Sequence, residues 1–234
     1  MTNEKYNIPI SEICLLTIER TLNIVRKKIP AFQRYINRKA DNKYGITFLP
    51  HDSNTSIDDV FSEYWYNDIQ REDIVLDIGS NVGAFSLFVS KFVEHVYAIE
   101  PVLYHIAKRN VAFNHIKNIT VIDTALGEGL LDIPWEGYKS RKIIGKSLTE
   151  IIQLCNLHPT FLKLDCEGGE WCIKPHELKG IRRIEAEIHN FDGKHNTMDF
   201  LRILNEAGFN YEYTSPRTGL LQIHARKINN EKSF

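Results

Sequence analysis

The clearest pattern in the chain is a set of short, uninterrupted apolar runs, each followed by an acidic residue. The run Ile74–Leu76 has no polar alternation, as expected for a strand that is buried on both faces of a parallel sheet. It ends at Asp77 and leads through a glycine turn into an apolar segment at residues 84–89, which is typical of a helix. Similar runs that end in acids follow at 96–100, 119–123 and 160–165. The pattern predicts an α/β fold with a parallel sheet.

Helix and turn signals separate these strands and continue toward the end of the chain. Ser147, followed three residues later by Glu150, forms a capping box that marks the start of a helix. Pro134 excludes a central strand at residues 131–137, so this stretch is expected to be irregular or to form an edge. Helices are expected at 103–114, 147–154 and 196–207, the last between an Asn196 cap and a Gly208 stop. Further strands are expected at 181–188 and, as a closing hairpin, at 210–214 and 220–225.

The first 55 residues have a different pattern. Apolar side chains recur at alternating three- and four-residue steps in residues 11–29, which indicates an amphipathic helix, and a second helical piece follows Pro30 at residues 31–40. Between residues 20 and 43 there are eight basic residues and one acid. This basic face is either solvated or a docking surface for an anionic partner. We expect an N-terminal helical extension and linker at residues 1–55 and a second domain at residues 56–234.

The glycine turn carries the first chemical signal. Its spacing from Gly79 to Gly83 is Gly-x-x-x-Gly, which differs from the Gly-x-Gly-x-x-Gly fingerprint of dinucleotide-binding folds. No Lys-Ser or Lys-Thr follows, so the sequence also lacks a P-loop. The acid before the turn, Asp77, would oppose a pyrophosphate. It suits a cationic ligand such as S-adenosylmethionine, whose methionine end has an ammonium group and a sulfonium.

Two further strands end in acids that suit the rest of such a cofactor. Glu100 follows the glycine turn by about 20 residues, where a carboxylate binds the ribose hydroxyls in nucleotide-binding folds. Asp123 ends the next strand and is expected to accept a hydrogen bond from the adenine amino group. Because the carboxyl ends of parallel strands meet at one edge of a sheet, the three acids predict one site. A nicotinamide-linked dehydrogenase stays open, since Glu100 would suit its ribose equally well.

Four motifs resemble those of the FkbM-type methyltransferases, over roughly residues 60–190. They are Asp77-Ile78-Gly79-Ser80-Asn81-Val82-Gly83, Ile99-Glu100-Pro101, Thr124-Ala125-Leu126-Gly127 and Leu162-Lys163-Leu164-Asp165-Cys166-Glu167-Gly168-Gly169-Glu170. The resemblance implies a class I methyltransferase fold, a doubly wound, Rossmann-like and mostly parallel seven-stranded sheet, with S-adenosylmethionine as cofactor. The predicted cofactor-binding residues are Asp77, Gly79, Ser80, Asn81, Gly83, Glu100, Pro101, Asp123 and Thr124.

Side-chain alternation in two strands predicts where the chemistry occurs. One face is shared by Lys163, Asp165 and Glu167 in the first strand and by Glu185, Glu187 and His189 in the second. A buried Lys163 needs a carboxylate partner, for which Glu185 or Glu187 is the candidate. Asp165, Glu167 and His189 then remain at the rim, facing the place where a methyl group would be presented.

Methyl transfer to oxygen needs a base that removes the hydroxyl proton. His189 is the first candidate because its usual pKa, about 6.5, leaves it mostly neutral near pH 7. Asp165 is the rival base, or holds the methionine ammonium or the acceptor. Asp165, Glu167 and His189 are the predicted catalytic residues. No residue is assigned as a metal ligand, although these three could also bind Mg²⁺ and activate the hydroxyl.

Composition narrows the class of protein without naming an acceptor. The 234 residues are 43% hydrophobic and 25% charged with a net charge of −1, as in an ordinary globular protein with no overall attraction to nucleic acid. The cysteines show no metal-ligand spacing; they are Cys14, Cys155, Cys166 and Cys172. We expect no signal peptide, no transmembrane segment and a cytoplasmic location.

The leading hypothesis is therefore an S-adenosylmethionine-dependent methyltransferase that acts on a hydroxyl of a sugar, glycan or small metabolite, as the resemblance implies. One alternative is an RNA methyltransferase that docks through the basic N-terminal helices. The other is a non-catalytic S-adenosylmethionine-binding protein that forms a homodimer through the stripe in residues 11–29.

Overall fold

The computed structural model describes residues 44–49, 60, 64–135, 138–190, 193 and 195–228. The chain divides into two compact units, residues 1–50 and 51–234, and the second contains all the helices and strands named below. The helices expected at residues 11–29 and 31–40, the domain boundary after residue 55 and the homodimer contact lie outside the described residues. They stay predictions.

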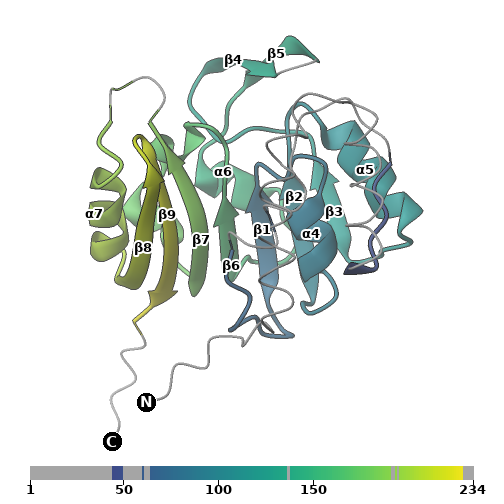
Figure 1. The fold of residues 1–234 in the computed structure, drawn as a ribbon, viewed down its shortest axis with the longest axis horizontal. Coiled ribbons are helices and arrows are strands. Elements are labelled where there is room, and N and C mark those ends of the chain that lie inside the picture. Colours follow the sequence, from purple (N-terminus) through teal and green to yellow (C-terminus); the bar gives the residue numbers. More distant parts are fainter. Residues whose placement is uncertain are drawn as a thin grey trace, which may run out of the picture. The chain divides into compact units, whose positions relative to one another are not determined.

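Seven strands form one sheet in the order β3-β2-β1-β6-β7-β9-β8. The strands are β1 (Ile74–Ile78), β2 (His95–Ile99), β3 (Ile119–Ile122), β6 (Phe161–Leu164), β7 (Arg183–His189), β8 (Phe209–Arg217) and β9 (Leu220–Lys227). β9 pairs antiparallel with both β7 and β8, while β1, β2, β3, β6 and β7 pair in parallel with one another. The predicted fold, a mostly parallel seven-stranded sheet with a closing hairpin, is confirmed (Figure 1).

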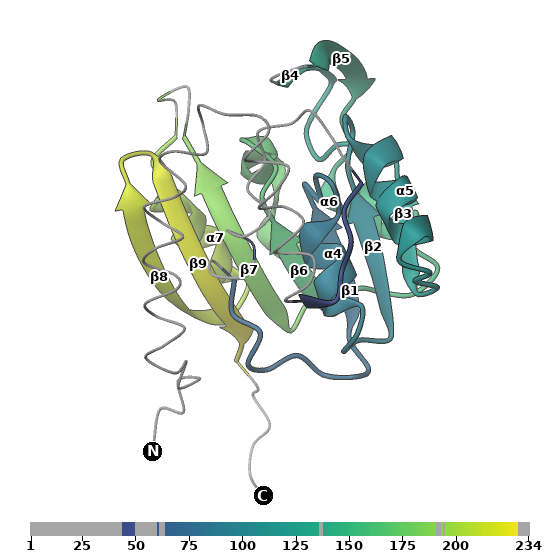
Figure 2. The ribbon, with the colours of Figure 1, turned by 45° about the vertical axis from the view of Figure 1, so that its right-hand side comes forward.

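The helices cover both faces of the sheet, as the doubly wound fold requires (Figures 1 and 2). They are α4 (Ala84–Val89), α5 (Tyr104–Phe113), α6 (Leu148–Gln153) and α7 (Asp199–Glu206). Phe85 and Val89 of α4 pack with Val75 of β1 on one face, whereas α6 and α7 pack with Leu76 on the other. Neighbouring residues of β1 therefore point to opposite faces and are apolar on both, which explains the uninterrupted apolar run.

The predicted helix signals are found with small shifts in position. Ser147 Oγ accepts a hydrogen bond from Glu150 N at 3.2 Å, and Glu150 Oε2 accepts one from Ser147 N at 2.8 Å, so the capping box is present. At α7 the side chain of Asn196 accepts from Met198 N, and the helix begins at Asp199, three residues later than expected. It ends before Gly208, whose φ of +75° is the left-handed conformation of a glycine stop.

Residues 130–144 form a separate antiparallel hairpin of β4 (Leu130–Trp135) and β5 (Tyr138–Ile144). The pairing register shifts between Ile133 and Trp135, on either side of Pro134, because proline lacks the N–H that a regular ladder needs. Pro134 is thus outside the main sheet, as expected, but the stretch is more regular than the sequence indicates. The hairpin stands beside the carboxyl ends of the main strands (Figure 1). Among the described residues, no helix has the length and apolar character needed to cross a membrane.

Candidate active site

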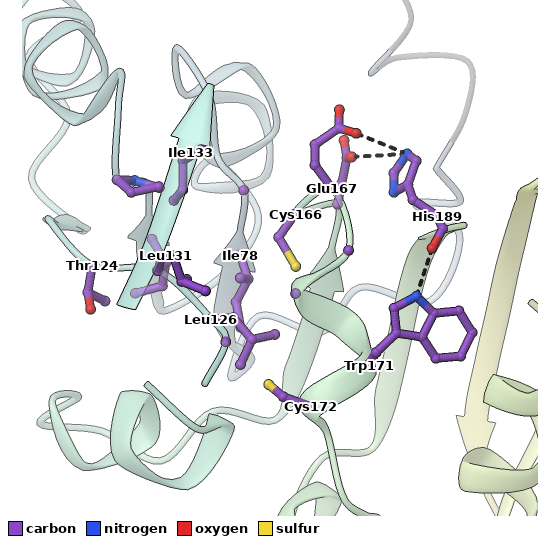
Figure 3. Close-up of a pocket in the computed structure, with 18 of the residues that line it drawn as sticks. Ile78, Thr124, Leu126, Leu131, Ile133, Cys166, Glu167, Trp171, Cys172 and His189 are labelled. Atoms are coloured by element: carbon purple, nitrogen blue, oxygen red, sulfur yellow. Dashed lines mark hydrogen bonds and ion pairs between the residues drawn. The ribbon is translucent and has the colours of Figure 1, made fainter. Parts of the chain in front are cut away.

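A large cavity opens at the carboxyl ends of β1, β2, β6 and β7. Its volume is about 1080 Å³, the upper end of the range for ligand pockets, so it has room for more than one reactant. Apolar side chains from the sheet edge, the loop after β3 and the β4–β5 hairpin form one wall, and acids with His189 form another (Figure 3). The apolar residues are Ile78, Ile99, Leu126, Leu131 and Ile133.

The glycine turn lines this cavity because Gly79 lets it approach β6 closely. Gly79 has a φ of +79°, and a Cβ added there would lie 1.7 Å from the backbone oxygen of Asp165. Any side chain would force the turn away from the carboxyl end of β6. Asn81 also lines the cavity, whereas Ser80 is buried and Gly83 is the N-cap of α4.

Asp77 lies beneath the cavity and does not line it. Its carboxylate is fully buried, accepts a 2.6 Å hydrogen bond from Ser86 Oγ and lies 3.3 Å from Lys163 Nζ. Lys163 Nζ also donates to Gly79 O at 2.9 Å and lies 3.6 Å from Asp165 Oδ2.

The predicted partners of Lys163 were therefore wrong. Glu185 instead binds Arg183 and His224, and Glu187 accepts from Gln222, because the lysine turns toward the neighbouring strand β1.

Glu100 has one acceptor position left for a ligand. Its Oε1 accepts the backbone N–H groups of Val102 and Leu103 at 2.7 and 2.9 Å, and its Oε2 accepts that of Asn81 at 2.9 Å. An ionised carboxylate offers about four acceptor positions, so three bonds leave one on Oε2. Burial raises the pKa of Glu100, and the three N–H groups oppose that rise.

The adenine end of the predicted site differs from expectation. Asp123 is held by Arg141 of β5, with oxygen to nitrogen distances of 2.5 and 3.0 Å, and is absent from the cavity lining. Arg141 also donates to the backbone oxygen of Pro101. Pro101 and Thr124 do line the cavity. The sequence pattern could not predict the arginine contact, because Arg141 belongs to a hairpin whose second strand had no signal.

His189 lies within a ring of carboxylates. Its Nε2 is 3.8 Å from Glu167 Oε2 and 4.0 Å from Asp165 Oδ1 (Figure 3). Its Nδ1 is 3.2 Å from Glu170 Oε1. Glu187 Oε2 is a further 3.7 Å neighbour of Nε2. Glu167 has a φ of +58°, a strained conformation for this residue type that turns its side chain toward the histidine. The three predicted catalytic residues thus come together at one wall of the cavity.

These carboxylates reverse the expected charge of His189. Burial alone would lower its pKa, but the hydrogen bond to Glu170 and the charges of Glu170, Glu167 and Asp165 raise it to about 9. His189 therefore carries a proton at neutral pH, and the expectation that it is neutral there does not hold.

Glu170 was not among the predicted site residues, although it ends the Lys-x-Asp-x-Glu-Gly-x-Glu string. It is fully buried and also accepts from the backbone N–H groups of Cys166 and Gly168.

Folding stability is expected to fall as the pH rises from about 6.5, the pKa of unfolded histidine, to about 9. Folded His189 binds its proton more tightly than unfolded His189. Its stabilising effect is therefore complete below the lower pKa and lost on passing the higher one. The pKa difference corresponds to about 3 kcal/mol. Urea unfolding at pH 6 and pH 9.5 measures this loss; a His189→Gln variant with the same pH dependence as the wild type would contradict the assignment.

Tryptophan and cysteine side chains also occur in the cavity wall. Trp171 lines the cavity and stacks on His195, with ring centroids 4.4 Å apart, whereas Trp65 lies away from it. The side chain of Trp135 is outside the described residues. Burial raises the pKa of Cys166 well above its usual value and that of Cys172 to about 11, so both thiols stay protonated and inert.

Sequence comparisons with known proteins match only part of the chain. No protein-family model matches, so the FkbM-type resemblance stays a prediction. The chain is 33% identical over 79 residues to a Haemophilus parainfluenzae 23S rRNA (uracil(1939)-C(5))-methyltransferase, RlmD, a match that covers 33% of this chain and 18% of that protein. It is 35% identical over 91 residues to an uncharacterized RNA methyltransferase of Streptococcus agalactiae serotype V, covering 36% and 20%. The chain thus spans about a fifth of the length of these relatives.

Two solved structures share the architecture. The human methyltransferase 10 domain containing protein superposes with a TM-score of 0.54 at 14% identity, over 86% of this chain and 96% of that one. A precorrin-6y C5,15-methyltransferase from Geobacter metallireducens gives a TM-score of 0.50 at 13% identity, over 77% and 95%. With the strand order, these similarities show that the chain has the Rossmann-like fold of class I methyltransferases.

Proposed function

We propose that the protein is an S-adenosylmethionine-dependent methyltransferase that acts on a hydroxyl group of a sugar, glycan or small metabolite. The observation that carries the proposal is the convergence of Asp165, Glu167 and His189 on one wall of a large cavity. That cavity lies at the carboxyl edge of a class I sheet, where open α/β folds bind their ligands.

The residues around the cavity fit S-adenosylmethionine. The apolar wall suits an adenine ring, and the remaining acceptor position of Glu100 suits a ribose hydroxyl. Asp165, which follows β6 and lines the cavity, suits the cationic methionine end. When bound, this cofactor supplies a methyl group on a positively charged sulfur that a nucleophile can take.

Glu167 is the proposed base in place of His189. The acceptor hydroxyl must lose its proton as its oxygen bonds to the methyl carbon, and a protonated His189 cannot accept that proton. Burial and the neighbouring carboxylates raise the pKa of Glu167, which makes it a better proton acceptor than an ordinary glutamate. Its side chain lines the cavity and is half exposed, within reach of a bound acceptor. His189 then holds Glu167 in place through its charge.

A metal mechanism remains the alternative for the same residues. Asp165, Glu167 and His189 each offer one ligand atom, and these atoms lie within 4.8 Å of one another. Mg²⁺ held there would lower the pKa of the hydroxyl directly. Loss of turnover on chelation, with recovery on adding Mg²⁺, would support this mechanism over the base.

Glu100→Gln is expected to weaken S-adenosylmethionine binding by about 1.5–3 kcal/mol, the range for a hydrogen bond to a charged group. The amide keeps the shape of the side chain but loses the charge that the ribose hydroxyl and three N–H groups bind. Calorimetric titration measures the change. Glu94→Gln is the matched control, because Glu94 is exposed and precedes the opposite end of β2. Equal affinities in all three proteins would argue against the cofactor assignment.

RNA is the second candidate acceptor, because the partial relatives are named as RNA methyltransferases. We call the wall formed by Asp165, Glu167 and His189 the catalytic wall. Its charge favours a small acceptor over RNA. Four carboxylates surround His189, and they would repel a polyanion that came close. Binding to RNA that falls steeply with salt concentration would support the second candidate. Cofactor binding without turnover on any acceptor would instead support a non-catalytic protein.

A further inference from the structure

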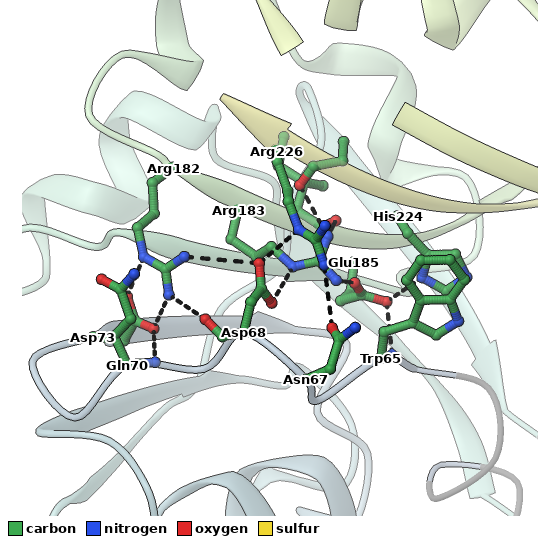
Figure 4. A network of polar contacts seen from close by, with 12 residues as sticks. Trp65, Asn67, Asp68, Gln70, Asp73, Arg182, Arg183, Glu185, His224 and Arg226 are labelled. Atoms are coloured by element: carbon green, nitrogen blue, oxygen red, sulfur yellow. Dashed lines mark hydrogen bonds and ion pairs between the residues drawn. The ribbon is translucent and has the colours of Figure 1, made fainter. Parts of the chain in front are cut away.

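Residues 64–73 form an anchored segment that leads into β1. Asp68 Oδ1 accepts from Arg183 Nε and Asp68 Oδ2 from Arg226 Nε, both at 2.8 Å (Figure 4). The backbone N–H of Trp65 donates to Glu185 at 3.0 Å, and the Trp65 ring lies parallel to that of His224 with centroids 3.8 Å apart. The segment is therefore fixed against β7 and β9, and with it the position of the residue at its start.

That residue, Tyr64, contacts the catalytic wall from behind. Its hydroxyl donates to Asp165 Oδ2 at 3.1 Å, the same oxygen that lies 3.6 Å from Lys163 Nζ. The ring is buried, packs edge-on against Phe85 and has Lys163 Nζ 5.5 Å from its centroid. Tyr64 is absent from the cavity lining, whereas Asp165 is part of it.

We propose that Tyr64 is a positioning residue: with Lys163 it holds one oxygen of Asp165, so that the other oxygen faces the cavity and binds the cationic methionine end of the cofactor. The inference rests on the proposed function. A carboxylate has two oxygens, and Oδ2 is occupied by a hydroxyl and an ammonium. Oδ1 is the oxygen on the His189 side, 4.0 Å from Nε2. Fixing this orientation before binding removes the cost of ordering the side chain when the ligand arrives.

The test removes the Tyr64 hydroxyl and keeps the ring. Tyr64→Phe is expected to raise the Kd for S-adenosylmethionine about tenfold, measured by calorimetric titration. Tyr66→Phe is the matched control, since Tyr66 packs on the same Phe85 but donates its hydroxyl to the backbone oxygen of Val60. The control is expected to bind the cofactor within twofold of the wild type.

A double-mutant cycle identifies the route of the effect. If Tyr64 acts through Asp165, Tyr64→Phe causes no further loss of cofactor affinity in an Asp165→Asn background. A role in packing alone would lower the melting temperature in both backgrounds and leave the Kd unchanged. An unchanged Kd in Tyr64→Phe, an equal loss in both backgrounds, or an equal loss in Tyr66→Phe would each overturn the inference. If the wild type binds the cofactor and transfers methyl groups, these failures leave the proposed function intact; a wild type that binds no cofactor would overturn both.

Discussion

Glu167→Gln is expected to lower kcat by about 10²–10⁴-fold, the usual contribution of a general base, with cofactor affinity retained. Glutamine has a similar shape and cannot accept the proton that the acceptor hydroxyl releases. The raised pKa of Glu167 supports its choice over Asp165, whose Oδ2 already accepts from Tyr64. Single-turnover kinetics with radiolabelled cofactor would measure the chemical step directly.

Glu206→Gln, at the exposed end of α7, is the control for the loss of one carboxylate and is expected to keep wild-type turnover. His189→Ala tests whether the charge of His189 holds Glu167 in place. Without the imidazolium, Glu167 loses a charged neighbour 3.8 Å away, and kcat is expected to fall with cofactor binding retained. Near-normal turnover in both Glu167→Gln and His189→Ala would rule out the proposed base. Loss of wild-type turnover on adding a chelator would mean that these residues bind a metal ion.

Arg183→Met is expected to lower the free energy of unfolding by about 3–5 kcal/mol, the cost of removing one partner from a buried ion pair. The guanidinium is fully buried and binds Asp68, Glu185 and the backbone oxygen of Ala225 (Figure 4). Methionine fills a similar volume but leaves the fully buried Glu185 without that cation. Urea unfolding monitored by circular dichroism measures the loss.

Arg226→Met provides a matched comparison on the same aspartate. Arg226 binds Asp68 Oδ2 at the same 2.8 Å, but its side chain is 48% exposed. Exposed ion pairs contribute about 0–1 kcal/mol, so this variant is expected to unfold almost as the wild type does. Equal destabilisation by the two substitutions would mean that burial is not what makes the Arg183 contacts matter.

Much of the fold was predictable because its signals are local. The apolar run Ile74–Leu76 reports burial on both faces, and the box of Ser147 and Glu150 reports a helix start. The hairpin at 130–144 was missed in part, since Pro134 is compatible with a strand only where the pairing shifts. The start of α7 was misplaced because Asn196 caps a turn that comes before the helix.

Part of the candidate site was also predictable. Parallel strands bring their carboxyl ends to one edge, so acids that follow successive strands are expected to meet there. Eight of the predicted residues line the cavity: Gly79, Asn81, Glu100, Pro101, Thr124, Asp165, Glu167 and His189. Asp77, near the end of β1, and Asp123, just after β3, form ion pairs with Lys163 and Arg141 and do not line the cavity. Alternation assigns a side chain to a face, and it does not show which neighbour the side chain reaches.

The amino-acid pattern alone therefore determined the fold class, the edge of the sheet that carries the site and the residue types gathered there. Only the tertiary structure decided the partner of Lys163, the proton on His189 and the contact of Tyr64 with Asp165. The reason is physical. Secondary structure follows from periodicity over a few residues, whereas an ion pair or a pKa depends on distances between side chains brought together by strand order. Tyr64 and Asp165 are 101 residues apart in the chain and 3.1 Å apart between their oxygens.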